Sequence, residues 1–347
     1  MIPAPPPIAV AASAFPALPG DLVIAIRKRA KVAGAVVMIG RRLGDDAYVD
    51  VLTTQGAPSA DGHTLFAVDG ITETITALLL AEGVRRGEVR LDEPVDELHD
   101  ADFHPPSRGA SPITLADLAT HRAGLRALPL REAAQPYAGI DRAAFASLVN
   151  QARPAQAAAT ASAPSVLDFA LLGTLLADRA GTSYAGLARE RVFVPLDMND
   201  SVADTGSDQR VIRGRSIADA AAAPWRYGAL EPAGGMRSSI YDLLRFAGAM
   251  FADDNGPLAA DMRLAGTSRA AAGDGSIGLG WRVESTGTRW ASGGSFGSTS
   301  FIGIAPQQHA AVVILSNVGL LFGNTSFDDV GLQVLAALAA SKRGATP

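Results

Sequence analysis

The segment 66–95, FAVDGITETITALLLAEGVRRGEVRLDEPV, decides how this chain can fold. Its second part (78–95) has the apolar spacing of one amphipathic helix, which a glycine ends before an extended exit. Its first part places Asp69 directly before Gly70 at the predicted helix start, and Glu73 three residues after that glycine. Because residues three apart lie on one helix face, Gly70 and Glu73 are predicted to border the same space.

The composition is that of a globular chain that has no cysteine and only a moderate net charge. A length of 347 residues with 48% hydrophobic content suits two domains, or one discontinuous domain with an insertion. The net charge of -5, without a run of Lys or Arg, argues against nucleic acid as a partner. The absence of cysteine excludes a disulfide framework, a thiolate nucleophile and a cysteine metal site.

The N-terminal segment 1–19, MIPAPPPIAVAASAFPALP, is interpreted as a Pro-rich leader. No Lys or Arg precedes Arg27, and four prolines within the first seven residues interrupt the apolar region that a secretory signal needs. No run approaches the roughly 18 uncharged apolar residues of a spanning helix. We therefore expect a cytoplasmic protein with no membrane partner.

Strand patterns lie at both ends of the remaining chain, and helix patterns lie between them. Segments 32–42 and 46–56 are predicted to form a hairpin with a Gly-Asp turn, and 278–285, 288–294, 298–306 and 309–317 are predicted strands. Predicted helices are 20–30, 70–86, 114–119, 141–152, 168–180, 183–192 and 328–342. This order predicts an α/β (α+β) fold. Residues 20–69 plus 226–347 would complete one antiparallel sheet domain, and 70–225 a mainly helical subdomain, with an active-site cleft between them.

Six segments carry a resemblance to a known superfamily. They are LLLAEGVRRGEVRLDEPV (78–95), ITLADLATHRAGL (113–125), FALLGTLLADRAGTSYAGLARERVFVPLDM (169–198), EPAGGMRSSIYDLLRF (231–246), GLGWRV (278–283) and GGSFGSTSFIGIAPQQHAAVVILSN (293–317). In this order they resemble the serine β-lactamase and DD-peptidase superfamily, in the branch of class C β-lactamases and family VIII esterases. The resemblance covers nearly the whole chain from about residue 20 and implies that fold, although a fold alone does not settle a function.

The superfamily's chemistry begins with a Ser-x-x-Lys at the start of a helix, where one turn puts the nucleophile beside the activating amine. Aligned on the family pattern F-x-x-G-S-x-x-K-T, this chain has Asp69 at the glycine, Gly70 at the nucleophile and Glu73 at the lysine. A glycine has no side chain to acylate. The resemblance therefore implies that the usual acyl-enzyme cannot form at this position.

The two other family clusters also depart from their patterns. The Tyr and Asn of the Tyr-x-Asn loop are replaced by Pro164 and Val166, and Ala291 stands where the strand motif has its Lys or His. The resemblance places the backbone amides of Gly70 and Gly294 at the oxyanion hole, where a backbone donor survives side-chain replacement.

The resemblance implies that the Glu73 side chain points into the active site of the family, with Asp69 and Asp168 near it. Carboxyl groups that share a partly apolar cleft raise at least one pKa, because like charges and desolvation both disfavour ionisation. Such a group suits acid–base catalysis without a covalent intermediate. The alternative is structural: Asp69 and Asp168 could cap helices, and Glu73 could favour the helix dipole.

Other polar residues have weaker claims to a role. Ser165, Ser292 and Ser295 are predicted pocket residues, but none has an evident base as its neighbour in sequence. His121 lies in THRAGL, a landmark segment, and is interpreted as bracing a loop, while His104 is expected to be solvated or to cap a helix.

The group Trp225, Arg226 and Tyr227 precedes a landmark that borders the cleft. It could form a specificity wall in which the arginine meets an anionic substrate, or it could pack its rings on the core. Clustered carboxylates can bind Mg²⁺ or Ca²⁺, but the acids here are scattered. We expect no metal and no cofactor.

Two functions of different class follow. The first is a repurposed enzyme that uses Glu73 for cyclisation, isomerisation, dehydration or water-mediated hydrolysis of a small carbonyl compound, such as a biosynthetic intermediate. The second is a non-catalytic relative that keeps the cleft to bind a ligand or a partner.

Overall fold

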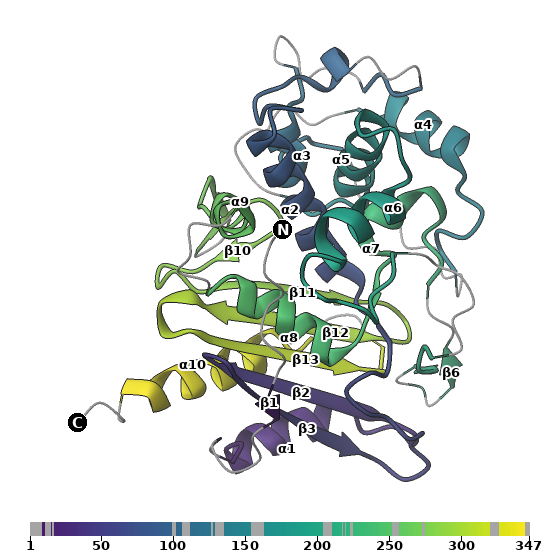
Figure 1. Cartoon of the computed structure of the whole chain (residues 1–347). Helices are drawn as coiled ribbons and strands as arrows, with labels where there is room; N and C mark the ends of the chain where they lie inside the picture. Colours follow the sequence, from purple (N-terminus) through teal and green to yellow (C-terminus); the bar gives the residue numbers. More distant parts are fainter. Residues whose placement is uncertain are drawn as a thin grey trace.

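The computed structural model is one large mixed sheet with helices on both faces and a helical region at one edge. The described residues are 9–10, 15, 17–98, 102–105, 112–125, 128, 135–153, 163–203, 210–216, 218, 220–222, 225–251, 257–272, 275–319 and 326–343. Most of the expected leader lies outside them. Figure 1 shows the sheet in the lower half of the molecule and helices α2 to α7 above it.

The main sheet has nine strands in the order β1-β3-β2-β13-β12-β11-β10-β9-β8, antiparallel except that β1 runs parallel to β3. Their bounds are β1 Ala9–Val10, β2 Val36–Leu43, β3 Asp46–Thr53, β8 Ala270–Ala272, β9 Gly275–Ile277, β10 Arg282–Val283, β11 Arg289–Gly294, β12 Thr299–Ala305 and β13 Ala310–Ser316. Two-stranded pairs are β4 Phe66–Ala67 with β7 Arg237–Ser238, and β5 Gly214–Arg215 with β6 Ala221–Ala222. The first and last parts of the chain thus meet in one sheet, which confirms the predicted fold class.

The helices are α1 Gly20–Arg29, α2 Thr72–Arg85, α3 Leu115–Ala119, α4 Arg142–Asn150, α5 Val166–Arg179, α6 Tyr184–Ala188, α7 Glu231–Gly234, α8 Ile240–Ala249, α9 Pro257–Ala265 and α10 Asp328–Arg343. Seven agree in place with the helices predicted from sequence. Helices α7, α8 and α9 were not predicted, because this part of the chain was interpreted only as a family landmark and a return to strands.

Both faces of the central strands are buried, which explains their almost continuous apolar sequence. In β2, Val36 and Met38 belong to the core beneath the helical region, while Val37 and Ile39 belong to the core formed with α1 and α10. Helix α8 packs so closely on the first face that a side chain at Gly40 would meet Ile240 at 2.9 Å. The alternation follows from the two-residue repeat of a strand.

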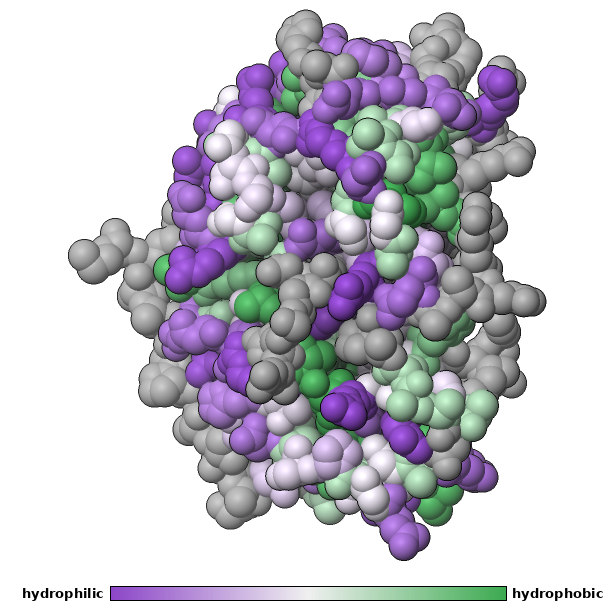
Figure 2. Space-filling view, turned by 90° about the vertical axis from the view of Figure 1, so that its right-hand side faces the viewer, coloured by the Kyte–Doolittle hydropathy of each residue, from purple (hydrophilic) through white to green (hydrophobic). Residues whose placement is uncertain are grey.

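On the outside, hydrophobic residues are scattered. Figure 2 shows them in separate patches among hydrophilic residues on the face turned toward the viewer. The exposed large apolar side chains of the described residues are Ile24, Val51, Leu148 and Val194, which come from four different elements or turns. Single apolar residues of this kind are normal on a globular surface.

Candidate active site

The entry to helix α2 is a 3₁₀ turn, Asp69–Ile71, packed against the edge of β11. Asp69 has a left-handed backbone (φ 43°), and its buried carboxylate accepts hydrogen bonds from the Tyr227 hydroxyl at 3.0 Å and the Ser298 hydroxyl at 2.6 Å. Burial raises the pKa of Asp69, and the Ser298 hydroxyl partly offsets it. No side chain caps α2, so the alternative of Asp69 as a helix cap is wrong. The Asp69 carboxylate instead connects the start of α2 to Tyr227 and Ser298 at the base of the site.

Gly70 lies against the backbone of β11. A side-chain carbon at this position would fall well inside van der Waals contact with the Ser292 carbonyl oxygen, and one at Gly293 would lie 2.6 Å from the Val68 carbonyl oxygen. Both neighbours are backbone atoms, which cannot rotate away as a side chain can. The close approach of helix entry and strand therefore requires glycine at both positions.

Glu73 and His121 form a direct contact inside the site. Glu73 Oε2 lies 3.2 Å from His121 Nε2, and their side chains are 20% and 7% exposed. The ring of His121 packs edge-on against Phe169, and its backbone is left-handed (φ 53°) immediately after α3. The expected loop-bracing role of His121 is thus too narrow, because its imidazole also reaches the acid on α2.

On its other side, His121 faces Asp168 in the first turn of α5. Nδ1 lies 3.4 Å from Asp168 Oδ2, which is an ion-pair distance rather than a close hydrogen bond. The Ser165 amide lies 3.3 Å from the same nitrogen and can donate to it only when Nδ1 carries no proton. Asp168 makes no helix cap, since no side chain caps α5. The three side chains form a carboxylate–imidazole–carboxylate series.

The charges in this series change the pKa of both His121 and Asp168. Burial lowers the pKa of His121, but the carboxylates of Glu73 and Asp168 outweigh burial and raise the pKa to about 10. Burial raises the pKa of Asp168 to about 7, although His121 opposes the shift. His121 is therefore an imidazolium at neutral pH, and Asp168 exchanges its proton in the same range.

The series opens into a cavity of about 250 Å³. It is lined by Gly70, Glu73, His121, Pro164, Ile277, Gly280, Trp281, Arg282, Trp290, Ala291 and Ser292. Of the residues predicted from sequence, Gly70, Glu73 and Ser292 line it, while Asp69, Ser165, Asp168, Gly294, Ser295, Trp225, Arg226 and Tyr227 do not. His121, Arg282 and Trp290 were not predicted as site residues.

A family model described as Beta-lactamase matches residues 13–328. The chain belongs to the beta-lactamase family. Among curated relatives, it is 29% identical over 188 residues to the D-alanyl-D-alanine-carboxypeptidase/endopeptidase AmpH of Escherichia coli (strain K12), covering 52% of this chain and 47% of AmpH. It is 26% identical over 242 residues to a beta-lactamase of the same strain, covering 68% and 61%. The chain thus spans about half the length of the first relatives it matches.

Solved structures show the same fold. A class C beta-lactamase superposes with a TM-score of 0.77 at 18% identity, over 92% of this chain and 94% of that one. A beta-lactamase/D-alanine carboxypeptidase from Yersinia pestis, complexed with citrate, gives 0.75 at 19%, over 92% and 97%.

Within this family fold, the aromatic group near residue 226 is a buried cluster. Trp225 and Tyr227 pack with Tyr137 and Phe296, while Arg226 is exposed and its backbone amide donates to the Gln135 side chain. Burial, and then the nearby Asp69 carboxylate, raise the pKa of Tyr227 well above its usual value. The Tyr227 hydroxyl joins this cluster to Asp69, and Arg226 is not among the residues that line the cavity.

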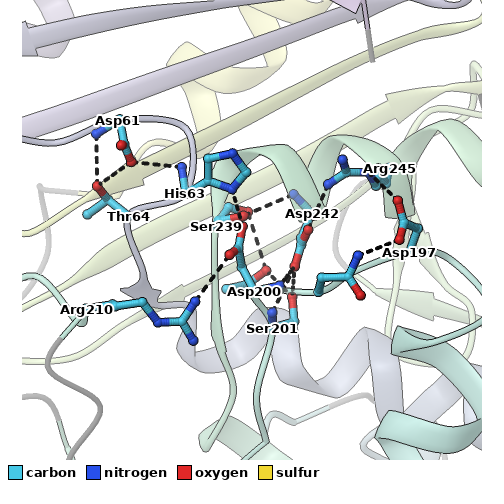
Figure 3. A network of polar contacts seen from close by, with 12 residues as sticks. Asp61, His63, Thr64, Asp197, Asp200, Ser201, Arg210, Ser239, Asp242 and Arg245 are labelled. Atoms are coloured by element: carbon cyan, nitrogen blue, oxygen red, sulfur yellow. Dashed lines mark hydrogen bonds and ion pairs between the residues drawn. The ribbon is translucent and has the colours of Figure 1, made fainter. Parts of the chain in front are cut away.

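A second polar network lies at the start of α8 (Figure 3). Asp242 Oδ2 accepts hydrogen bonds from the Asp200 amide, the Ser201 amide and the Ser201 hydroxyl at 2.8–2.9 Å, and Arg245 pairs with Oδ1 at 3.0 Å. His63 Nδ1 meets Asp200 at 2.8 Å. These contacts connect two segments, around residues 63 and 200, to the start of α8, which is a structural role.

Among the described residues, no group of three or more His, Cys, Asp or Glu side chains is arranged to hold a metal ion. None of the helices in that part of the chain has the length and apolar character to cross a bilayer.

Proposed function

We propose that this chain is a non-covalent acid–base enzyme, and that Glu73 transfers the proton. The observation that carries the proposal is the contact of Glu73 with His121 at 3.2 Å on the wall of a small cavity. The Ser-x-x-Lys apparatus is lost in this proposal, since Gly70 offers no nucleophile and its surroundings leave no room for one. The substrate is a small carbonyl compound such as a biosynthetic intermediate, met in the cytoplasm.

The proposed step is proton abstraction next to a carbonyl group. The Glu73 carboxylate accepts a proton from the α-carbon, and the C–H electron pair moves into the enolate. The resulting carboxylic acid returns that proton to another carbon in an isomerisation, or to a leaving hydroxyl in a dehydration. Cyclisation and water-mediated hydrolysis use the same group as base. We assign the Gly70 amide to the developing oxyanion, because Gly70 lines the cavity and Gly294 does not.

His121 and Asp168 lie behind Glu73 in this scheme. The His121 imidazolium places a positive charge 3.2 Å from the carboxylate that acts as the base. Asp168 faces the other ring nitrogen of His121 at 3.4 Å, and its pKa is about 7. Asp69 is a positioning residue in the proposal, because its carboxylate contacts Tyr227 and Ser298 rather than the cavity.

Hydrogen–deuterium exchange tests the proposal. A panel of small ketones, esters and lactones is incubated with the full chain in D₂O and followed by NMR. We expect catalysed exchange or turnover of at least one compound, its loss in Glu73→Gln, and its retention in Glu190→Gln, which changes an exposed glutamate. Ligand binding without exchange or turnover for any compound would instead support the non-catalytic binding protein.

A further inference from the structure

The cavity has a second functional wall, formed by a row of side chains across three strands. Ile277 of β9 pairs with Arg282 of β10, and Arg282 pairs with Trp290 of β11. Residues directly opposite in antiparallel strands project from the same face, so the three side chains stand next to one another. All three line the cavity that Glu73 and His121 also line.

Arg282 is a cation without an acidic neighbour in this row. Its guanidinium carbon lies 5.7 Å from the centroid of the Trp290 ring. The Asp328 carboxylate at the start of α10 is close enough for Arg282 to oppose the rise that burial causes in its pKa, but the two form no ion pair among the described residues. The Trp290 indole is itself fixed, because its N–H donates to Glu284 at 2.7 Å. A guanidinium held on a fixed aromatic ring presents its N–H groups in a preset orientation.

The chemistry of the row selects a small anion with an apolar body. Guanidinium matches a carboxylate by two parallel hydrogen bonds, while Ile277, Trp281 and Trp290 supply apolar surface beside it. Glu73, which also lines the cavity, disfavours a second negative charge. The volume of about 250 Å³ lies below the ~300–1,000 Å³ of sites for drug-sized ligands.

We propose that this cavity binds a small monocarboxylate, with its carboxylate on Arg282 and its apolar body against Trp290. The inference names a ligand class for the site of the proposed function and rests on that function only in using the same cavity. Binding is measured without turnover, so the two proposals can fail separately.

Tryptophan fluorescence provides the measurement. The chain has three tryptophans, and two of them, Trp281 and Trp290, line the cavity. The full chain is titrated with benzoate and, separately, with the neutral analogue benzamide. We expect saturable quenching by benzoate, and binding of benzamide weaker by about ten- to a hundredfold, which is the range for loss of a charge-assisted hydrogen-bonded pair.

Matched variants locate the binding site. Arg282→Gln should weaken benzoate binding about ten- to a hundredfold, with a smaller loss in Arg282→Lys, whereas Arg226→Gln at an exposed position should leave it unchanged. Trp290→Phe should remove much of the fluorescence change, and Trp225→Phe should retain it. Glu73→Gln should keep or improve benzoate binding even where it abolishes turnover.

Three results would overturn the inference. They are no saturable binding of benzoate, equal binding of benzoate and benzamide, and unchanged benzoate affinity in a folded Arg282→Gln. Tighter binding of phenyl phosphate than of benzoate would overturn the assignment to a monocarboxylate.

Discussion

Asp242 and Asp168 are both inaccessible carboxylates near the start of a helix, but they are surrounded in opposite ways. Asp242 receives three hydrogen bonds from residues 200 and 201 and an ion pair from Arg245. Asp168 accepts no hydrogen bond from the described residues, and the one opposite charge within ion-pair distance of it among them is His121 at 3.4 Å, while the Glu73 and Asp117 carboxylates add like charges. Burial raises the pKa of both acids.

The difference separates a structural carboxylate from one suited to proton exchange. A fully hydrogen-bonded buried acid fixes the segments that donate to it. An acid with a single titratable partner can exchange a proton with that partner, because few other contacts oppose the change. Substitutions in and around the two acids test this contrast.

The first prediction concerns Glu73, at the open end of the cluster. Glu73→Gln keeps the shape of the side chain but removes its basicity, so turnover of any substrate found should fall by about 10²–10⁴-fold. The measurement is kcat with the thermal midpoint recorded in parallel. If the variant keeps full activity and is slightly less stable, Glu73 serves the helix rather than catalysis.

The second prediction is that Asp242→Asn costs about 2–4 kcal/mol of unfolding free energy. The amide keeps one acceptor oxygen, so its NH2 group faces either the donors of residues 200 and 201 or Arg245, and Arg245 loses its charged partner in both cases. Denaturant unfolding measures the loss, with Asp45→Asn in the exposed hairpin turn as the control. A cost below about 0.5 kcal/mol, typical of surface changes, would remove the contrast between the two acids.

The fold was predictable because it depends on patterns that repeat along the chain. Gly44 and Asp45 form the predicted two-residue turn between β2 and β3, and both strands lie close to the segments predicted for them, 32–42 and 46–56. Helical spacing was also sufficient to place Glu73 one turn beyond Gly70. These features depend on neighbours in sequence, so one sequence contains them.

The partners of Glu73 were not predictable in the same way. His121 lies 48 positions from Glu73, and its left-handed backbone after α3 has no strong signal in a non-glycine residue. Arg282 lies beside Trp290 because β10 pairs with β11, and β10 is only two residues long, too short for a clear strand pattern. Ser292 was predicted as a pocket residue and lines the cavity, but the lack of space for a side chain at Gly70 depends on backbone atoms that the sequence does not place.

The third prediction concerns that lack of space. Gly70→Ser should cost about 1–3 kcal/mol, because the new side chain meets the Ser292 carbonyl oxygen and the strand must shift. It should not create β-lactam or ester hydrolysis, since Glu73 replaces the activating amine. Mass spectrometry after incubation with a penicillin checks both forms. A stoichiometric adduct on any serine of the unmodified protein would contradict the loss of acyl-enzyme chemistry.

The smallest effect is expected for Asp168→Asn, where two contributions of opposite sign nearly cancel. The amide avoids the cost of an ionised buried carboxyl, but it also removes one of the two carboxylates that stabilise the His121 imidazolium. We expect a change in unfolding free energy within about 1 kcal/mol at neutral pH, in contrast to Asp242→Asn.

The pH dependence gives this prediction its direction. The pKa of Asp168 rises from 3.8 in the unfolded chain to about 7 in the folded protein, so the folded state binds more protons between these values. The stability contributed by Asp168 is therefore present below about pH 4 and lost as the pH rises to about 7. The raised pKa of His121 extends the loss of stability upward from pH 6.5 toward about pH 10.

Denaturant unfolding of wild type and Asp168→Asn from about pH 4 to about pH 7 should show the wild type losing stability relative to the variant. Asp45→Asn should show no such trend. A wild type that gains stability relative to Asp168→Asn as the pH rises would mean that Asp168 is stabilised as a carboxylate, which would give it the same structural character as Asp242.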